Sequence, residues 1–231
     1  MRDGRIVSAV ITCAGQGTRF GSNKLLVNLG GRTVLERTVR ALSVDPVDEV
    51  IVTASAENAD LYRRILRDAG LDVTVVIGGA ERHLSARHGL QSTRGEIVVV
   101  HDGVRPFVQP TAVSAVVDAA MQHGAAMLGT PSTVQIKLVG EDGFVQGSLE
   151  RQHSWMGQTP QAFDRDLLAT AYDRAVASGY SRVSDDADLV HEFTGTAARM
   201  LTGSAENIKI TTPQDLATAR LIAERRTADE R

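Results

Sequence analysis

A short glycine-rich segment carrying two cations follows the first apolar run of the chain, and these residue types together favour binding of an anion. The run Ile6–Cys13 is apolar and leads directly into residues 14–24, with the sequence AGQGTRFGSNK. Glycines in such a turn let the backbone approach a ligand closely, so that successive N–H groups point at phosphate oxygens. Arg19 and Lys24 add positive charge. We expect the phosphate-binding residues of the loop to be Ala14, Gly15, Gln16, Gly17 and Thr18.

The spacing of this loop separates it from two commoner phosphate-binding loops. It has neither the Gly-x-x-x-x-Gly-Lys-Ser/Thr pattern of a P-loop nor the third glycine of a Rossmann dinucleotide loop. With a strand before it and cations after it, the segment resembles the signature loop of nucleotidyltransferases, which join a nucleoside triphosphate to a phosphorylated acceptor. Taken alone, it also fits an ordinary strand-to-helix turn.

A carboxylate and an arginine follow another apolar run, in the segment 101–106 with the sequence HDGVRP. Mg²⁺ prefers few protein oxygens together with phosphate oxygens and water, so Asp102 beside a triphosphate is sufficient for a magnesium site. A structural ion pair between Asp102 and Arg105 is the alternative. We interpret His101 as a packed residue that orients its neighbours rather than as a base.

A third polar segment, residues 78–85 with the sequence GGAERHLS, also follows a predicted strand. Arg82 and Ser85 are one helical turn apart and therefore share a face. A hydroxyl both donates and accepts, which suits the edge of a pyrimidine, and the two glycines allow close backbone approach. A plain turn followed by a helix start is the alternative. Arg151 and Lys209 are further candidate phosphate ligands, although isolated cations of this kind are usually solvated.

Composition limits the class of protein. The 231 residues are 42% hydrophobic and 23% charged, enough for a single α/β domain over residues 1–231. The net charge of −3 argues against a nucleic-acid partner, because such a site neutralises many phosphates. The single cysteine, Cys13, excludes an intramolecular disulfide and fits a packed core thiol. Without an apolar signal segment or a run of roughly 18 apolar residues, we expect a soluble, cytoplasmic protein with no membrane partner.

The alternation of apolar runs with helical patterns predicts a mostly parallel sheet. Val/Ile-rich runs typical of strands buried on both faces lie at 6–13, 49–54, 73–77 and 96–101. Between these runs, apolar residues recur at helical spacing over 33–42 and 56–69. Strand–helix alternation of this kind favours right-handed crossovers, and ligands then gather at the carboxyl ends of the strands. The glycine-rich loop and Asp102 both fall at such ends.

Between residues 133 and 157 the pattern changes to alternating polar and apolar residues. Val134–Val139 and Phe144–Leu149 flank a turn at 141–143, which predicts a protruding β-hairpin arm. The exposed edge of such an arm offers a surface to a second subunit, so we expect a homodimer formed through residues 133–157. The elements predicted after the arm are helices at 165–177 and 185–193, a strand at 199–202 and a last helix that starts at Pro213 with Thr212 as its N-cap.

Five ordered motifs together resemble the family of 2-C-methyl-D-erythritol 4-phosphate cytidylyltransferases and the related ribitol-phosphate cytidylyltransferases. The motifs are Ala14-Gly15-x-Gly17-x-Arg19 with Lys24, Gly78-Gly79-x-x-Arg82-x-x-Ser85, Val100-His101-Asp102-Gly103-x-Arg105-Pro106, Gln158-Thr159-Pro160-Gln161-x-Phe163 and Asn207-Ile208-Lys209-Ile210-Thr211. The resemblance extends over residues 6–222. It implies a Rossmann-like nucleotidyltransferase fold, in which a mostly parallel twisted sheet is flanked by helices and carries a protruding β-hairpin arm.

The resemblance also implies roles for residues on the nucleotide side. It implies that Arg19 and Lys24 bind the phosphates of CTP, the co-substrate. It assigns cytosine recognition to Gly79 and Ser85, which lie beside Arg82 in the same motif. Asp102 is implied as the residue that helps to hold Mg²⁺.

On the acceptor side, the resemblance implies contacts to the acceptor phosphate or the reacting phosphates from Arg105, Arg151 and Lys209. Arg151 reaches across from the partner subunit's arm in this family, which agrees with a homodimer. The residues expected to act directly on the reacting phosphates are Arg19, Lys24, Arg151 and Lys209.

Four positions depart from the family pattern. The pair 134–135 is Val-Gln, where the family usually carries Asp-Thr and that Thr contacts the acceptor, so Gln135 indicates an altered acceptor pocket. Ser184 stands where Thr is usual and keeps a hydroxyl for the acceptor. Asn23 replaces a proline before the loop lysine, which predicts a looser loop.

The expected reaction is in-line attack by an acceptor phosphate oxygen on the α-phosphorus of CTP, with release of pyrophosphate. The acceptor is expected to be a small polyol phosphate, methylerythritol phosphate or ribitol phosphate. Residues 104–107 and 156–158 look more like the ribitol-phosphate branch. A small phosphonate is an alternative acceptor, because the change at 134–135 removes a carboxylate and a hydroxyl. The sequence is also compatible with a sugar-phosphate nucleotidyltransferase that uses UTP or GTP, and with a non-catalytic nucleotide-binding module.

Overall fold

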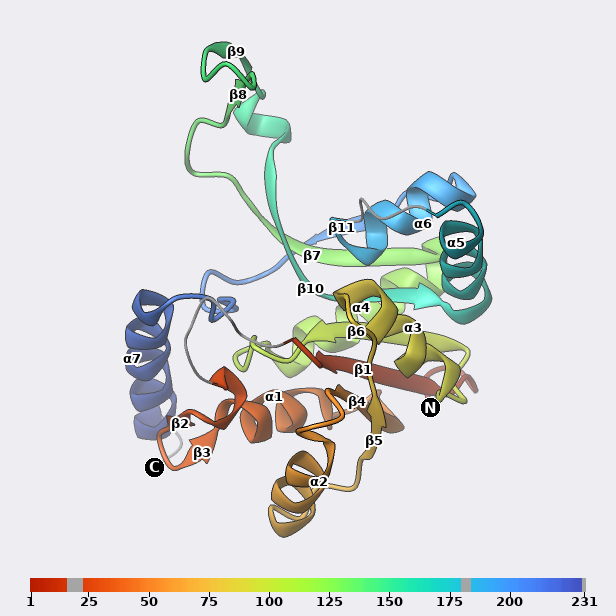
Figure 1. The fold of residues 1–231 in the computed structure, drawn as a ribbon, viewed down its shortest axis with the longest axis vertical. Coiled ribbons are helices and arrows are strands. Elements are labelled where there is room, and N and C mark those ends of the chain that lie inside the picture. The colour runs from red at the N-terminus through yellow and green to blue at the C-terminus, as the bar shows by residue number, and fades with distance from the viewer. Residues whose placement is uncertain (16–22, 180–183, 230–231) are drawn as a thin grey trace.

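The computed structural model describes residues 1–15, 23–179 and 184–229, and its centre is a seven-stranded sheet (Figure 1). In spatial order the strands are β11 (Arg199–Thr202), β7 (Ala125–Pro131), β10 (Trp155–Asp164), β6 (Ile97–Asp102), β1 (Val7–Cys13), β4 (Glu49–Ala54) and β5 (Thr74–Ile77). β10 runs antiparallel to both of its neighbours, and every other pair in this sheet is parallel. The predicted mostly parallel sheet is therefore confirmed.

The central strands have the burial that their Val/Ile-rich sequences predict. All six residues of β6 are buried, and so are six of the seven residues of β1. β5 differs, because it forms the edge of the sheet and only Val75 in it is buried. The prediction that all four apolar runs are buried on both faces is therefore wrong for β5, since an edge strand keeps part of its surface in water.

Helices cover both faces of the sheet and form two hydrophobic cores. One core contains residues of α1 (Val34–Leu42), α2 (Ala59–Asp68), α4 (Pro110–His123) and α7 (Pro213–Asp229). The other core contains residues of α3 (Arg82–Gln91), α5 (Arg165–Ala177) and α6 (Asp186–Thr194). Side chains of β1 alternate between the two cores, as expected for a strand in the middle of three layers.

Two helix starts show how local sequence fixes the elements. At α1, Thr33 and Glu36 form a capping box, in which each side chain accepts a hydrogen bond from the other residue's backbone N–H. At α7, the Asp215 carboxylate accepts from the N–H of Thr212 at 2.7 Å, and Thr212 Oγ1 accepts from the N–H of Asp215 at 3.2 Å. The predicted N-cap at Thr212 is therefore confirmed.

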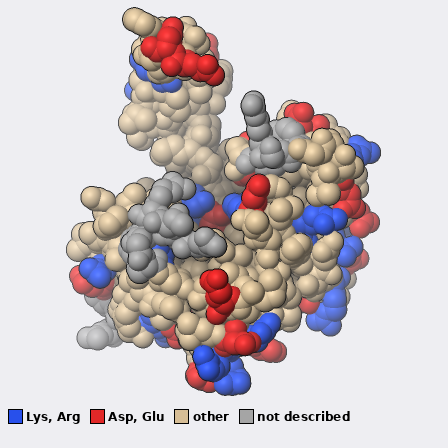
Figure 2. Space-filling view, in the orientation of Figure 1, with Lys and Arg blue, Asp and Glu red and all other residues tan. Residues whose placement is uncertain are grey.

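The segment between β7 and β10 projects from the body of the molecule as an arm. Its tip is the antiparallel pair β8 (Lys137–Val139) and β9 (Val145–Ser148), shorter than the strands predicted from the alternating pattern. Figure 2 shows the arm standing away from the body, with charged side chains at its tip. Several apolar side chains on it are exposed, among them Val139 at 56% and Phe144 at 74%. Over the part of the chain that the structure describes, no helix has the length and apolar character needed to cross a membrane.

Candidate functional site

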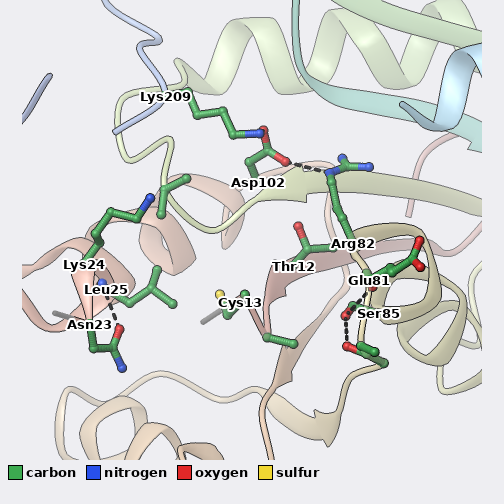
Figure 3. A pocket seen from close by; sticks show the side chains of 15 residues that line it. Thr12, Cys13, Asn23, Lys24, Leu25, Glu81, Arg82, Ser85, Asp102 and Lys209 are labelled. Atoms are coloured by element: carbon green, nitrogen blue, oxygen red, sulfur yellow. Dashed lines mark hydrogen bonds and ion pairs between the residues drawn. The ribbon is translucent and has the colours of Figure 1, made fainter. Parts of the chain in front are cut away.

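A cavity of about 360 Å³ lies at the carboxyl ends of β1 and β6 (Figure 3). The short 3₁₀ helix η2 (Lys24–Leu26) and the N-terminal part of α3 supply further wall residues. Of the residues predicted from the sequence, those that line the cavity are Ala14, Gly15, Lys24, Gly79, Arg82, Ser85, Asp102 and Lys209. Four separate motifs therefore meet at one place, and the three that follow a strand do so as the sheet predicts.

The glycine-rich loop contributes both of its ends to this cavity. The predicted residues Gln16, Gly17, Thr18 and Arg19 lie outside the described residues. Lys24 begins η2, and Figure 3 shows it on the side of the cavity opposite Arg82.

Asn23, at the second end of the loop, is held by hydrogen bonds of its side chain. Its side-chain oxygen accepts from the N–H of Leu25 at 3.1 Å and caps η2. Its amide nitrogen donates to the hydroxyl of Tyr62 at 2.8 Å. Burial raises the pKa of Tyr62 to about 12, so this phenol stays a neutral partner. Residues 16–22 lie outside the described residues, so the predicted looser loop stays a prediction.

Asp102 is the centre of the charged network in the cavity. Its carboxylate contacts Nε of Arg82 at 2.9 Å and Nζ of Lys209 at 3.0 Å. Nε of Arg105 lies 3.2 Å from it on the buried side. Burial by itself raises the pKa of Asp102, but the charges of Arg82, Lys209 and Arg105 outweigh burial and hold the pKa well below its usual range. Asp102 is therefore ionised and holds two of the cavity's cations in place.

Arg82 is held by a second carboxylate, which sequence reasoning missed. Its Nη1 donates to Oδ2 of Asp186 at 2.7 Å, and the hydroxyl of Tyr172 donates to Oδ1 of Asp186 at 2.6 Å. Asp186 has no exposed surface. It opens α6, where an acidic residue is common because the helix N-terminus carries partial positive charge, so its sequence position gave no separate sign of a site.

The glycine pair before α3 brings the chain close to the first strand. A Cβ at Gly78 would lie 2.6 Å from the Cβ of Ala14, so a larger residue there displaces the turn. Ser85 is 2% exposed, and its hydroxyl lies 3.1 Å from the carbonyl oxygen of Gly79 and 3.0 Å from that of Glu81. Ser85 thus fixes the turn at Gly79 and forms part of the cavity wall, which is where the sequence predicts a base-reading hydroxyl.

The predicted acceptor residues lie in three different places. Lys209 lines the cavity, whereas Arg105 is 11% exposed behind Asp102 and donates to the carbonyl oxygen of Asn207 at 2.8 Å. Gln135 and Arg151 are exposed on the arm, and neither lines the cavity of its own chain. Ser184 is exposed just before α6, where its hydroxyl contacts Asp188.

Cys13 and His101 are packed residues, as their sequence positions predict. Burial raises the pKa of the Cys13 thiol well above its ordinary value, so the thiol is protonated and a poor nucleophile although it lines the cavity. Burial also lowers the pKa of His101, to about 4, and the imidazole is therefore neutral at neutral pH.

The parallel sheet, the glycine turn after its first strand and the cations around one carboxylate define a nucleotidyltransferase with a Rossmann-like fold. A family model described as IspD, 2-C-methyl-D-erythritol 4-phosphate cytidylyltransferase, matches residues 7–225. The chain belongs to this family.

Individual relatives of known name or structure are similar to this chain over nearly its whole length. A 2-C-methyl-D-erythritol 4-phosphate cytidylyltransferase of Pelotomaculum thermopropionicum is 39% identical over 228 residues, which cover 95% of each chain. A solved structure of the 4-diphosphocytidyl-2C-methyl-D-erythritol synthase of Anaerococcus prevotii has a TM-score of 0.85 at 32% identity, covering 96% of this chain and 97% of the other. The corresponding cytidylyltransferase structure from Thermus thermophilus has a TM-score of 0.80 at 32% identity, covering 95% and 99%.

Proposed function

We propose that this enzyme transfers CMP from CTP to 2-C-methyl-D-erythritol 4-phosphate and releases pyrophosphate. The observation that carries the proposal is one cavity at the end of the first strand, in which Arg82 and Lys209 contact Asp102 and Lys24 lines the opposite side. Membership of the family supports methylerythritol phosphate as the acceptor over ribitol phosphate, although residues 104–107 and 156–158 look more like the ribitol-phosphate branch. The named relatives likewise favour a phosphate ester over a phosphonate.

In the proposed reaction an oxygen of the acceptor phosphate forms a bond to the α-phosphorus of CTP. The bond between that phosphorus and the bridging α–β oxygen breaks, and pyrophosphate leaves with the electron pair. Negative charge grows on the α-phosphate and the bridging oxygen. Lys24 and Lys209, with Arg19 from the loop, are proposed to stabilise that charge more in the transition state than in the ground state.

The nucleotide itself is proposed to lie across the turns at 14–18 and 78–79. Ala14, Gly15, Gln16, Gly17 and Thr18 would present backbone N–H groups to the phosphates. Gly79, Arg82 and Ser85 would surround the base at the start of α3, where all three line the cavity. The Ser85 hydroxyl donates to the carbonyl oxygens of Gly79 and Glu81, so its oxygen would accept a hydrogen bond from a donor on the edge of the base.

The residues present also fit a divalent cation that enters with the nucleotide. Over the described residues no group of three or more His, Cys, Asp or Glu side chains is arranged to hold a metal alone. One cavity carboxylate, Asp102, is nevertheless enough, because Mg²⁺ takes one or two carboxylates together with phosphate oxygens and water. Bound there, Mg²⁺ would withdraw charge from the phosphates.

We also propose that the enzyme is a homodimer in which the 133–157 arm completes the acceptor site of the partner. Apolar side chains exposed on the arm give it a surface to bury. Gln135 and Arg151 lie on the arm outside their own chain's cavity, so a role in acceptor binding requires the other subunit's cavity.

Arg105, Lys209 and Ser184 are the proposed acceptor contacts on the main body, with residues 1–231 forming one domain. A cytoplasmic location agrees with the single buried thiol of Cys13.

The test is pyrophosphate release from CTP and Mg²⁺ with a panel of acceptors. We expect release with 2-C-methyl-D-erythritol 4-phosphate, and at least roughly tenfold slower release with ribitol 5-phosphate, glycerol phosphate and small hydroxyalkyl phosphonates, because one lost buried polar contact costs about that much. UTP, GTP and ATP are the nucleotide controls. Pyrophosphate release with a phosphonate and with no other acceptor would contradict the proposal that the acceptor is 2-C-methyl-D-erythritol 4-phosphate. CTP binding without any pyrophosphate release would indicate a non-catalytic module.

A further inference from the structure

His101 lies directly behind the charged centre of the site and has no exposed surface. Its Nε2 is 2.9 Å from the carbonyl oxygen of Arg105, and its Nδ1 is 3.0 Å from Oγ1 of Thr159. The same Thr159 hydroxyl accepts a hydrogen bond from the backbone N–H of Asp102 at 3.0 Å. One imidazole and one hydroxyl therefore contact both ends of the turn that carries Asp102 and Arg105.

The chemistry of these partners allows one placement of hydrogens that satisfies all of them. A carbonyl oxygen only accepts, so the Nε2 facing Arg105 must carry the hydrogen. A neutral imidazole has a single N–H, and Nδ1 is therefore the acceptor for the Thr159 hydroxyl, whose oxygen in turn accepts from Asp102. A cationic ring would carry a second hydrogen at Nδ1, and the Thr159 hydrogen would then lose its acceptor.

Thr159 connects this turn to a third part of the site. Its carbonyl oxygen accepts from Nδ2 of Asn207 at 2.8 Å, and the carbonyl oxygen of Asn207 accepts from Arg105 at 2.8 Å. Asn207 is 1% exposed and lies two residues before Lys209. The pairing of β10 with β7 shifts register between Gln158 and Gln161, so Thr159 lies where the strand departs from regular pairing.

We propose that His101 and Thr159 are positioning residues that fix the Asp102–Arg105 turn, and through it the cations Arg82 and Lys209, in the geometry needed for the phosphates. Neither side chain lines the cavity, so neither is placed to touch a substrate or to act as a base on it. The expected effect on catalysis rests on the proposed function. The position of the hydrogen on the His101 ring does not depend on the proposed function.

The first test compares Thr159→Val with Thr159→Ser. Valine keeps the shape but leaves the Asp102 N–H and the His101 ring without a partner, and an unsatisfied buried polar group of this kind corresponds to roughly a 10- to 100-fold effect. We expect kcat/KM for CTP to fall by that factor in Thr159→Val and to return to within about threefold of wild type in Thr159→Ser. Thr93→Val is the matched control, because Thr93 is a buried threonine whose hydroxyl donates to the carbonyl oxygen of Leu90 and does not line the cavity.

The second test observes the position of the ring hydrogen directly, by ¹⁵N NMR of the histidines in the wild-type protein and in Thr159→Val at the pH of the activity assay. We expect the His101 hydrogen on Nε2 in the wild-type protein, where it faces the carbonyl oxygen of Arg105, and a displaced Nδ1 resonance in Thr159→Val. A ring protonated on Nδ1, or equal kcat/KM in Thr159→Val and wild type, would overturn the proposal. A wild-type enzyme that is inactive with CTP would instead contradict the proposed function and leave the NMR result to stand alone.

Discussion

Nη1 of Arg82 and Oδ2 of Asp186 are 2.7 Å apart, and this ion pair joins the cavity at the carboxyl ends of β1 and β6 to the start of α6. Arg82 uses its Nε for Asp102 and its Nη1 for Asp186, so its guanidinium plane is fixed from two sides. Three cations in this cluster face two carboxylates, which leaves the cluster with one net positive charge. Arg82 is therefore a prearranged residue rather than a flexible surface cation.

Removing the charge of Asp186 should destabilise the fold. In Asp186→Asn the Arg82 guanidinium loses one of its two buried partners, and breaking a buried ion pair from one side typically costs about 3–5 kcal/mol. We expect the free energy of unfolding in urea to fall by about 3 kcal/mol, with weaker CTP binding by calorimetry.

The control for that prediction is Asp173→Asn, which breaks a pair with Arg87 on the surface of α5. The Asp173 side chain is 68% exposed, and surface pairs contribute about 0–1 kcal/mol. Equal losses in the two variants would show that the buried pair has no special role.

The Val/Ile-rich strands and most helices could be predicted from the sequence. Buried parallel strands are continuous apolar runs, whereas amphipathic helices repeat their apolar residues at helical spacing. β10 could not be predicted in the same way. It contains Pro160 and pairs antiparallel between β6 and β7, and proline normally argues against an interior strand. β7 could not be predicted from the sequence either, because it contains small residues such as Ala125 and Gly129 where strands are usually rich in β-branched residues.

The residues of the candidate site that belong to contiguous sequence motifs could be predicted. Those that join the site only through tertiary contacts could not. The motifs around Lys24 and Asp102 each follow a strand, and the parallel sheet brings them to one edge. Tyr172 and Asp186 belong to two different helices, and in sequence Tyr172 fits an apolar position of α5. Their role appears only when α5 and α6 pack together against α3.

Lys24 is expected to act in the chemical step. We expect Lys24→Ala to lower kcat by roughly 10²–10³-fold, because a preorganised charge on the reacting phosphates is lost. Circular dichroism and the unfolding midpoint should stay close to wild type. Arg67→Ala, on the exposed side of α2, is the control for removal of a cation and should keep full activity. Near-normal turnover by Lys24→Ala would contradict the assignment of this cavity.

The start of α7 should make a measurable contribution to stability in acid. Partial burial raises the pKa of Asp215, but hydrogen bonds from Thr211 and Thr212 outweigh it and lower the pKa to about 2. A pKa lowered by folding means that the unfolded chain binds the proton more tightly, so the stabilisation is complete above about pH 4 and is lost as the pH falls toward 2. In Asp215→Asn, unfolding measured between pH 4 and 2 should depend less steeply on pH. An unchanged slope would show that the carboxylate is not linked to folding.

Arg151 is expected to act in the cavity of the partner subunit, and a mixed dimer separates this from action within one chain. We expect both Lys24→Ala and Arg151→Ala homodimers to be nearly inactive. A purified heterodimer with one chain of each kind then has one cavity with an intact Lys24 that receives an intact Arg151 from the other chain. Its turnover should be roughly half that of the wild-type dimer.

The matched control is a heterodimer of Lys24→Ala with Lys209→Ala. Both of these lysines line the cavity of their own chain, so each of its two cavities carries one defect and activity should not return. If Arg151 acts within its own chain, the first heterodimer will be as inactive as the second. If the protein sediments as a monomer at assay concentrations, the arm does not complete a partner's site. Recovery in the first heterodimer alone therefore requires Arg151, exposed on the arm outside its own cavity, to reach the acceptor phosphate of its neighbour.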